Sequence, residues 1–338
     1  MQPRVFSGIQ PTGNPTLGNY LGAIRNWAEG QDRFDNIFCV VDLHALTLPQ
    51  NPEELRQHTW ETAAMLLAAG IDPDRSLLFV QSHVPEHTAL AWLLNTITPM
   101  GWLNRMTQFK TKAGSERDSV GAGLFNYPVL MAADILAYDA HLVPVGDDQK
   151  QHVELTRDIA ERFNSLFGET FTVPQPLIPD VGARIMSLDD PSKKMSKSDP
   201  SGAISLSDPP DVVRKKVARA VTDSLGIVRF DPAQAGLYNL LSIHRILSGL
   251  SAQEMEARFE GQGYRAVKEE VATLISDALK PLQDRYESYR REPEVVDRIL
   301  ADGADRAHEM AAPTVRRAAE RMGLRSRLES RQVAGPAL

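Results

Sequence analysis

Short apolar runs alternate with longer amphipathic stretches in the first half of the chain. Four runs have the composition of strands buried on both faces, and they cover residues 5–9, 37–41, 77–80 and 142–145. Stretches with helical periodicity lie between them. This order predicts a parallel α/β sheet with helices on both faces. Ligands of such sheets bind beyond the carboxyl ends of the strands, so functional residues are expected there.

Two of the intervening helices carry clear end signals. Asn51-Pro52-Glu53-Glu54 reads as an N-cap, a proline at the first helical position and a glutamate at N3 that completes a box-like cap. This helix is expected to end at Gly70, a natural residue just after a helix. A second helix over residues 148–167 is expected to stop at Gly168.

The pattern changes in the second half of the chain. Residues 189–210 are rich in proline and serine, which predicts a loop. The following segments have helical patterns, and no apolar run of comparable strength interrupts them: 211–221, 238–247, 252–259, 267–290, 294–300 and 304–322. We therefore expect a helical second domain. The predicted division is an α/β domain over 1–188, a loop and linker over 189–207, and a helical domain over 208–330.

Composition narrows the class of protein. A chain of 338 residues with 42% hydrophobic and 24% charged residues is long enough for two domains and too apolar for wholesale disorder. Its one cysteine, Cys39, excludes an intramolecular disulfide and a cysteine zinc site, which favours a reducing compartment such as the cytoplasm. The formal net charge of −7 argues against non-specific binding to nucleic acid, although not against a local basic patch.

A charge-free segment over residues 87–104 is the nearest approach to a membrane span. It contains Asn95, Thr96, Pro99 and other residues that a lipid-facing helix tolerates poorly. A buried helix and an interface helix are equally compatible with it, and no membrane association is expected.

A glycine-rich segment follows the first predicted strand. Residues 8–22 contain Gly8, Gly13, Gly18 and Gly22, which let the backbone approach a ligand closely ahead of a helix. Asn14-Pro15 stands where a P-loop requires Lys-Ser/Thr, and the G-x-G-x-x-G spacing is absent. The spacing alone fits an ordinary strand-to-helix turn equally well.

A lysine-rich segment, Lys193-Lys194-Met195-Ser196-Lys197-Ser198, lies in the predicted loop. Ammonium groups on a flexible loop suit a polyphosphate and can stabilise charge on a leaving group. In isolation a solvated basic loop explains the segment better.

Together the two segments resemble the paired signatures of class I aminoacyl-tRNA synthetases. Thr16-Leu17-Gly18-Asn19 stands at the HIGH signature, and Lys194 to Ser198 is an unaltered KMSKS pentapeptide. Further segments are similar to bacterial tryptophanyl-tRNA synthetases: Asp42-x-His44-Ala45, Met131-Ala132-Ala133-Asp134, residues 143–152 from Val143 to His152, and residues 182–187 ahead of the pentapeptide. The likeness extends over essentially the whole chain and is denser before Asp223.

The resemblance implies a Rossmann-like catalytic domain followed by an anticodon-binding helical domain. It implies that L-tryptophan and ATP form tryptophanyl-adenylate and pyrophosphate, and that the tryptophan is then transferred to tRNA(Trp). The reaction needs no covalent enzyme intermediate, so positioning and electrostatics carry it. Mg²⁺ is expected to be held mainly by the phosphates, with no protein metal site. Family members are homodimers, and residues 87–104 are a candidate interface.

The resemblance also assigns residues to ATP and to catalysis. Those assigned to ATP are Gln10, Pro11, Thr12, Gly18, Asn19, Gly146, Asp147, Asp148, Ile185, Lys194, Met195, Ser196, Lys197 and Ser198. Those assigned to the catalytic step are Thr16, Asn19, Lys112, Lys194 and Lys197. Asp147 and Asp148 also fit a purely structural role near a helix N-terminus.

For tryptophan, the resemblance implies an apolar slot with one acceptor for the indole N–H. Asp134 stands at the acceptor position. Phe6, His44, Met131, Val143 and Val145 are expected as walls, and Tyr127 and Gln149 as partners of the amino and carboxylate groups. The apolar members would be buried in any case, and a lone histidine is more often a satisfied core residue than a ligand.

For tRNA, two basic stretches of the helical domain fit, residues 211–219 and 316–331, although solvated helix faces explain them equally well.

Three rival interpretations of the function remain. A tyrosyl enzyme shares the fold and the chemistry, a paralogue could bind without charging tRNA, and a small nucleotidylyltransferase would lack KMSKS and the helical domain.

Overall fold

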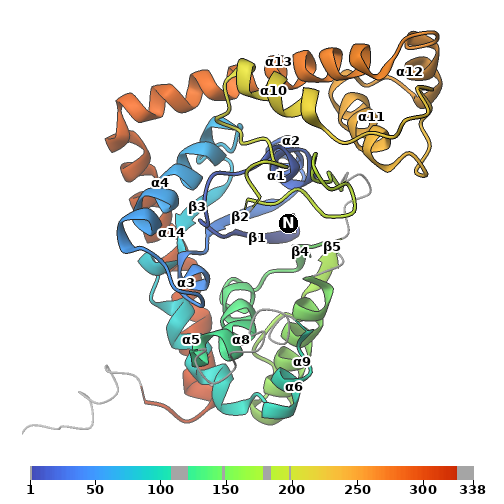
Figure 1. The fold of residues 1–338 in the computed structure, drawn as a ribbon. Helices are drawn as coiled ribbons and strands as arrows, with labels where there is room; N and C mark the ends of the chain where they lie inside the picture. The colour runs from blue at the N-terminus through green and yellow to red at the C-terminus, as the bar shows by residue number, and fades with distance from the viewer. Residues whose placement is uncertain (1, 108–120, 147–148, 178–183, 198, 326–338) are drawn as a thin grey trace, which may run out of the picture.

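A five-stranded parallel sheet forms the centre of the molecule (Figure 1). The computed structural model describes residues 2–107, 121–146, 149–177, 184–197 and 199–325. The strand order is β3-β2-β1-β4-β5, and every neighbouring pair is parallel. The bounds are β1 Arg4–Ile9, β2 Asp35–Val40, β3 Leu77–Val80, β4 Leu142–Pro144 and β5 Gln175–Leu177. The predicted doubly wound α/β fold is confirmed.

Four strands lie within two residues of their predicted bounds, and the sequence prediction missed the fifth. Strand β5 is an edge strand of three residues with Pro176 at its centre. Proline lacks the N–H of a strand ladder and is tolerated at a sheet edge. The flanking prolines therefore gave this segment the appearance of a loop.

Helices cover both faces of the sheet. They are α1 Leu17–Asn19, the π-helix η1 Tyr20–Ile24, α2 Arg25–Glu29, α3 Asp42–Ala45, α4 Pro52–Ala68, the 3₁₀ turn η2 Gln81–His83, α5 Glu86–Ile97, α6 Met100–Asn104, α8 Ala122–Leu136 and α9 Lys150–Phe167. Asn51 caps α4 as predicted, because its side chain accepts from the amides of Glu53 and Glu54. Gly70 and Gly168 follow α4 and α9 with positive φ angles. Within the described ranges, no helix combines the length and the apolar character that a membrane crossing requires.

The predicted helical second part is also present. It contains α10 Pro210–Arg219, α11 Ala235–Ser248, α12 Ala252–Arg258, α13 Tyr264–Arg291 and α14 Pro293–Arg321. Figure 1 shows α10 to α13 together above the sheet, with α13 crossing the top of the molecule. Helix α14 turns back and packs against β3 and α5. Ala307, Ala311 and Ala318 of α14 share a core with Phe79 and Leu90.

The prediction of two helices over residues 294–300 and 304–322 was wrong, because α14 is continuous. Gly303 does not interrupt it. A Cβ atom at this position would overlap the carbonyl oxygen of Leu78. Glycine is therefore required here for the close approach of α14 to β3.

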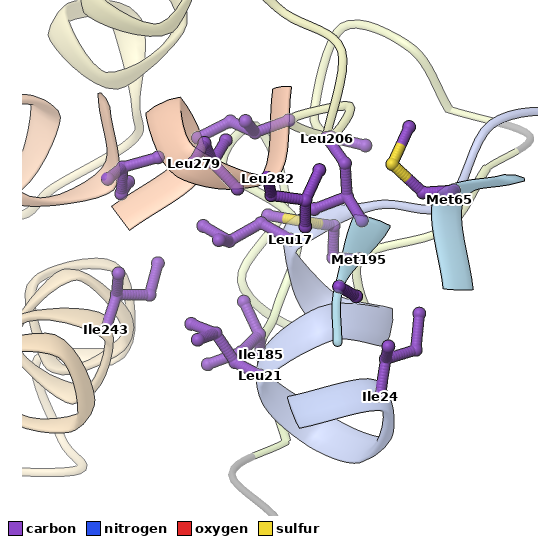
Figure 2. Close-up of a cluster of buried hydrophobic side chains, with 14 of the residues drawn as sticks. Leu17, Leu21, Ile24, Met65, Ile185, Met195, Leu206, Ile243, Leu279 and Leu282 are labelled. Carbon is purple, nitrogen blue, oxygen red and sulfur yellow. The ribbon is translucent and has the colours of Figure 1, made fainter. Parts of the chain in front are cut away.

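A second apolar cluster joins the glycine-rich turn to the helical part. Figure 2 shows its side chains gathered from distant parts of the chain. Leu17 and Leu21 come from the turn, Met195 comes from the KMSKS segment, and Leu279 and Leu282 come from α13. Each of these side chains is almost fully buried. The cluster thus holds the described part of the KMSKS segment, residues 194–197, between the sheet and α13.

Candidate active site

A cavity of about 580 Å³ opens beside the carboxyl ends of β1 and β4. Strand β1, the residues after β2, helix α8, and the segment from β4 to α9 supply its walls. All eight residues assigned to tryptophan by resemblance line it: Phe6, His44, Tyr127, Met131, Asp134, Val143, Val145 and Gln149. Gly8, Gln10, Val41, Ile135 and Pro144 also line it. The structure therefore brings the predicted tryptophan set together around one cavity.

Asp134 is the acidic group among the described residues that line this cavity. Its side chain is 1% exposed and lies on α8, among buried side chains that are mostly apolar. Its Oδ2 accepts a hydrogen bond from Nε2 of His44 at 2.7 Å. Its Oδ1 accepts from Nε2 of Gln81 and from Nδ1 of His87, both at 2.6 Å. A buried carboxylate with several donors is held in one orientation.

The donors also keep Asp134 ionised. Burial raises the pKa of a carboxyl group, but the charge and hydrogen bond of His44, followed by those of His87, outweigh it and lower the pKa of Asp134 to about 2. The cavity thus presents a fixed negative charge at neutral pH. This charge suits a donor such as an N–H group.

Three residues of this network were missed by the sequence prediction: Gln81, His87 and Tyr138. The hydroxyl of Tyr138 lies 2.7 Å from Nε2 of His87. Gln81 follows β3 directly, and His44 lies in α3, the short helix after β2. For Gln81 the available signal was a polar residue just beyond a buried strand, because the carboxyl ends of parallel strands meet at one edge.

Tyr127 extends the polar part of the cavity. Its hydroxyl lies 2.7 Å from Nε2 of His152 on α9. Burial raises the pKa of Tyr127 to about 12, so the hydroxyl stays protonated at neutral pH. The ring of His44 meets the ring of Tyr127 edge-on at 6.1 Å between centroids. Tyr127 and Gln149 stand at the end of the cavity that α9 borders.

The KMSKS segment lies against the glycine-rich turn. A Cβ atom on Gly18 would stand 3.2 Å from Cβ of Met195. The amide of Met195 donates to the carbonyl of Ile185 at 3.0 Å, and the amide of Leu17 donates to the carbonyl of Ile204 at 2.8 Å. The two signatures are far apart in sequence and converge in space, as the resemblance predicts.

Lys197 connects this segment to the cavity. Its Nζ donates to the carbonyl of Gln10 at 3.0 Å, and Gln10 lines the cavity. Burial lowers the pKa of Lys197 to about 8. Lys194 and Ser196 are exposed. The segment therefore offers one half-buried ammonium beside the cavity and one ammonium in solvent.

Thr16 and Asn19 form a reciprocal cap at the start of α1. The amide of Asn19 donates to Oγ1 of Thr16 at 3.3 Å, and the amide of Thr16 donates to Oδ1 of Asn19 at 3.0 Å. Such a capping box satisfies two backbone donors that the helix leaves unpaired. These two side chains fix the geometry of the turn.

Comparison with known proteins identifies the family. The family model described as tRNA synthetases class I (W and Y) matches residues 1–280. The chain belongs to this family. It is 54% identical over 326 residues to the tryptophan–tRNA ligase of Wolinella succinogenes, covering 96% of this chain and 99% of the relative. It is 53% identical over 323 residues to that of Gloeobacter violaceus, covering 95% and 96%.

Solved structures of class I synthetases have the same fold. A tryptophanyl-tRNA synthetase from Mycoplasma pneumoniae is 37% identical with a TM-score of 0.87, covering 96% of this chain and 99% of that chain. One from Campylobacter jejuni, complexed with ADP and tryptophan, is 35% identical with a TM-score of 0.82 and covers 95% and 100%. The chain is thus an aminoacyl-tRNA synthetase, and the predicted class I catalytic fold is confirmed.

Some residues assigned to this synthetase site lie outside the described residues, namely Lys112, Asp147, Asp148 and Ser198. Pro11 and Ile185 are buried next to the turn, whereas Thr12 and Gly146 are exposed. Among the described residues, no group of three or more His, Cys, Asp or Glu side chains is arranged to hold a metal ion.

Proposed function

We propose that this synthetase joins L-tryptophan to tRNA(Trp) in two steps at the cavity of Asp134. The tryptophan carboxylate attacks the α-phosphorus of ATP, the bond to the β-phosphate breaks, and pyrophosphate leaves. A terminal ribose hydroxyl of the tRNA then attacks the carbonyl carbon of the adenylate, and AMP leaves. The buried, ionised Asp134 beside the apolar walls of the cavity is the observation that carries the assignment to tryptophan.

In this proposal the cavity walls hold the indole ring and Asp134 accepts its N–H. An analogue without the donor leaves one acceptor position of the buried carboxylate unpaired, which costs about 1–3 kcal/mol. Tyr127 and Gln149 bind the amino and carboxylate groups from the opposite end. This orientation directs the tryptophan carboxylate toward Gln10 and the glycine-rich turn.

The glycine-rich turn and the KMSKS segment receive ATP in the proposal. Gly18 lets the nucleotide approach the backbone, and Ile185 and Met195 border the base. Lys194 and Lys197 neutralise charge that grows on the pyrophosphate leaving group. Mg²⁺ bound to the phosphates would neutralise further charge, and the phosphates would supply most of its ligands. Thr16 and Asn19 orient the turn for this contact.

The tRNA is assigned to the helical part, and the structure narrows the candidate cations. Lys216 is occupied by Asp208, with Nζ 2.8 Å from Oδ2. Arg317 is likewise held by Asp139 at 3.1 Å. Arg214 and Arg219 on α10 are exposed, and they are better candidates for phosphate contacts.

We further propose that the enzyme is a cytoplasmic homodimer. The candidate interface segment contains α5 and α6, where His87 is fully buried but Trp92 is 71% exposed and Met100 is 64% exposed. Large exposed apolar side chains are typical of association surfaces. Sedimentation equilibrium of the purified chain and of Trp92→Glu tests this proposal, which predicts a dimer for the first and a weaker one for the second.

The decisive experiment is ATP–pyrophosphate exchange with each of the twenty amino acids. We expect exchange that depends on tryptophan alone. Exchange that depends on tyrosine would overturn the assignment. Tryptophan-dependent exchange without charging of any tRNA would instead support the non-charging paralogue.

A further inference from the structure

Three donors surround Asp134 unequally. A carboxylate has about four acceptor positions, two on each oxygen. Gln81 and His87 occupy both positions of Oδ1, and His44 occupies one of Oδ2. His44 lines the cavity, whereas Gln81 and His87 lie behind it. One acceptor position therefore remains, and it belongs to the oxygen that His44 shares.

His87 is fixed from several sides. It is fully buried, and its two ring nitrogens face different partners, Asp134 and the hydroxyl of Tyr138. The ring of Phe79 lies 5.7 Å away between centroids and that of Tyr138 lies 5.4 Å away. An ionised carboxylate only accepts hydrogen bonds, so Nδ1 of His87 must donate to it. The Tyr138 hydroxyl holds the opposite nitrogen and fixes the tilt of the ring.

Gln81 is fixed in a similar way. Its Oε1 accepts from the amide of Leu43 at 3.2 Å, which leaves its Nε2 to donate to Asp134. The side chain therefore bridges the ends of two neighbouring strands, because Leu43 follows β2 and Gln81 follows β3. Neither Gln81 nor His87 touches the cavity. Both act on a substrate only through Asp134.

We propose that Gln81, His87 and Tyr138 are positioning residues that set the specificity of this cavity. They saturate Oδ1 and lock the carboxylate, so that a single acceptor position of Oδ2 meets the substrate. The substrate class selected is an aromatic amino acid with one ring N–H at a fixed place. This inference rests on the proposed function. It adds an explanation of how the enzyme rejects an amino acid of the same shape that lacks the ring N–H.

The test compares tryptophan with its analogue that carries sulfur in place of the indole N–H. The readout is the ratio of kcat/KM for tryptophan to kcat/KM for this analogue in pyrophosphate exchange. Tyr138→Phe removes one hydroxyl and keeps the ring. We expect it to lower the ratio roughly five- to tenfold, the size of one hydrogen bond, with KM for ATP unchanged. His87→Leu should lower the ratio further, and His87→Asn should restore part of it by supplying an N–H donor.

Phe79→Leu is the matched control. It removes a ring that packs on His87 and Tyr138, but Phe79 makes no hydrogen bond to Asp134. We expect it to lower the melting temperature while the selectivity ratio stays near the wild-type value. Circular dichroism of each variant verifies folding, and Tyr138→Phe decides the matter if His87→Leu does not fold.

Two results would overturn the inference. In one, folded Tyr138→Phe keeps the wild-type ratio. In the other, Phe79→Leu lowers the ratio as much as Tyr138→Phe, which would make packing the cause. Failure of the proposed function is distinct, because the wild-type chain itself would then show no tryptophan-dependent exchange.

Discussion

At the scale of single residues, Asp134 and Lys197 carry the polar chemistry of the cavity in opposite ways. The surroundings of Asp134 favour its charged form despite burial, and its pKa is lowered to about 2. Nζ of Lys197 donates to the carbonyl oxygen of Gln10, and burial lowers the pKa of Lys197 to about 8. The carboxylate of Asp134 is therefore charged throughout the neutral pH range, whereas the ammonium of Lys197 loses its proton near pH 8.

Asp134→Ala should impair tryptophan use much more than ATP use. We expect KM for tryptophan to rise roughly 10- to 100-fold, because a hydrogen bond to a charged group is lost. KM for ATP should change less than about threefold. Initial rates of pyrophosphate exchange at varied tryptophan and ATP give both values. Equal damage to both would show that Asp134 acts as a structural residue.

Lys197 should take up a proton when ATP binds near pH 8. Below pH 8 the free enzyme already carries the ammonium, and above it the amine is neutral until phosphate raises its pKa. At pH 8 the uptake should approach about half a proton. Calorimetric titrations in two buffers of different ionisation enthalpy measure it.

Lys197→Met is the control for this titration. It should abolish the uptake and slow adenylate formation about 100-fold, with tryptophan affinity nearly unchanged. Undiminished uptake in this variant would assign the proton to another group.

At the scale of elements, apolar runs and cap residues determined most of what could be predicted. The strands of the sheet centre are buried on both faces, so their composition is distinctive. Strand β5 was missed because prolines at a sheet edge look like a loop. The prediction divided α14 in two because a glycine such as Gly303 is typical of a helix end. The reason for this glycine is its close approach to β3, and the sequence alone does not show which strand lies next to the helix.

Gly303→Ala should therefore destabilise the protein, although alanine favours helices. The added Cβ would meet the carbonyl oxygen of Leu78, so either α14 or β3 must shift. We expect a loss of about 1–3 kcal/mol in the free energy of unfolding, typical of overpacking. Urea unfolding measures it. Gly123→Ala, in a helix with open space at that position, is the control and should be neutral or stabilising.

At the scale of the whole molecule, the helical part supports a segment of the candidate active site. Asn239 of α11 binds the backbone of Met186 twice, since Oδ1 accepts from the amide and Nδ2 donates to the carbonyl, both at 2.9 Å. Met186 in turn pairs with Lys194 in a β-bridge. The cavity walls were predictable from family resemblance, but this long-range support and the donors behind Asp134 were not.

Asn239→Ala should slow catalysis from a distance. Loss of both hydrogen bonds frees the segment that carries Lys194, so we expect kcat for pyrophosphate exchange to fall about tenfold. KM for tryptophan should stay within about twofold, because the indole cavity is untouched. A change in KM for tryptophan with an unaltered kcat would contradict this prediction.

The contact between Lys197 and the Gln10 carbonyl has one more consequence. The ammonium of Lys197 already has a hydrogen-bond partner in the protein, so a phosphate that binds it must replace this contact. The free energy that ATP gains at Lys197 is the difference between the two contacts. The loss of ATP affinity measured after replacing Lys197 will therefore be smaller than the full attraction between its ammonium and the phosphates.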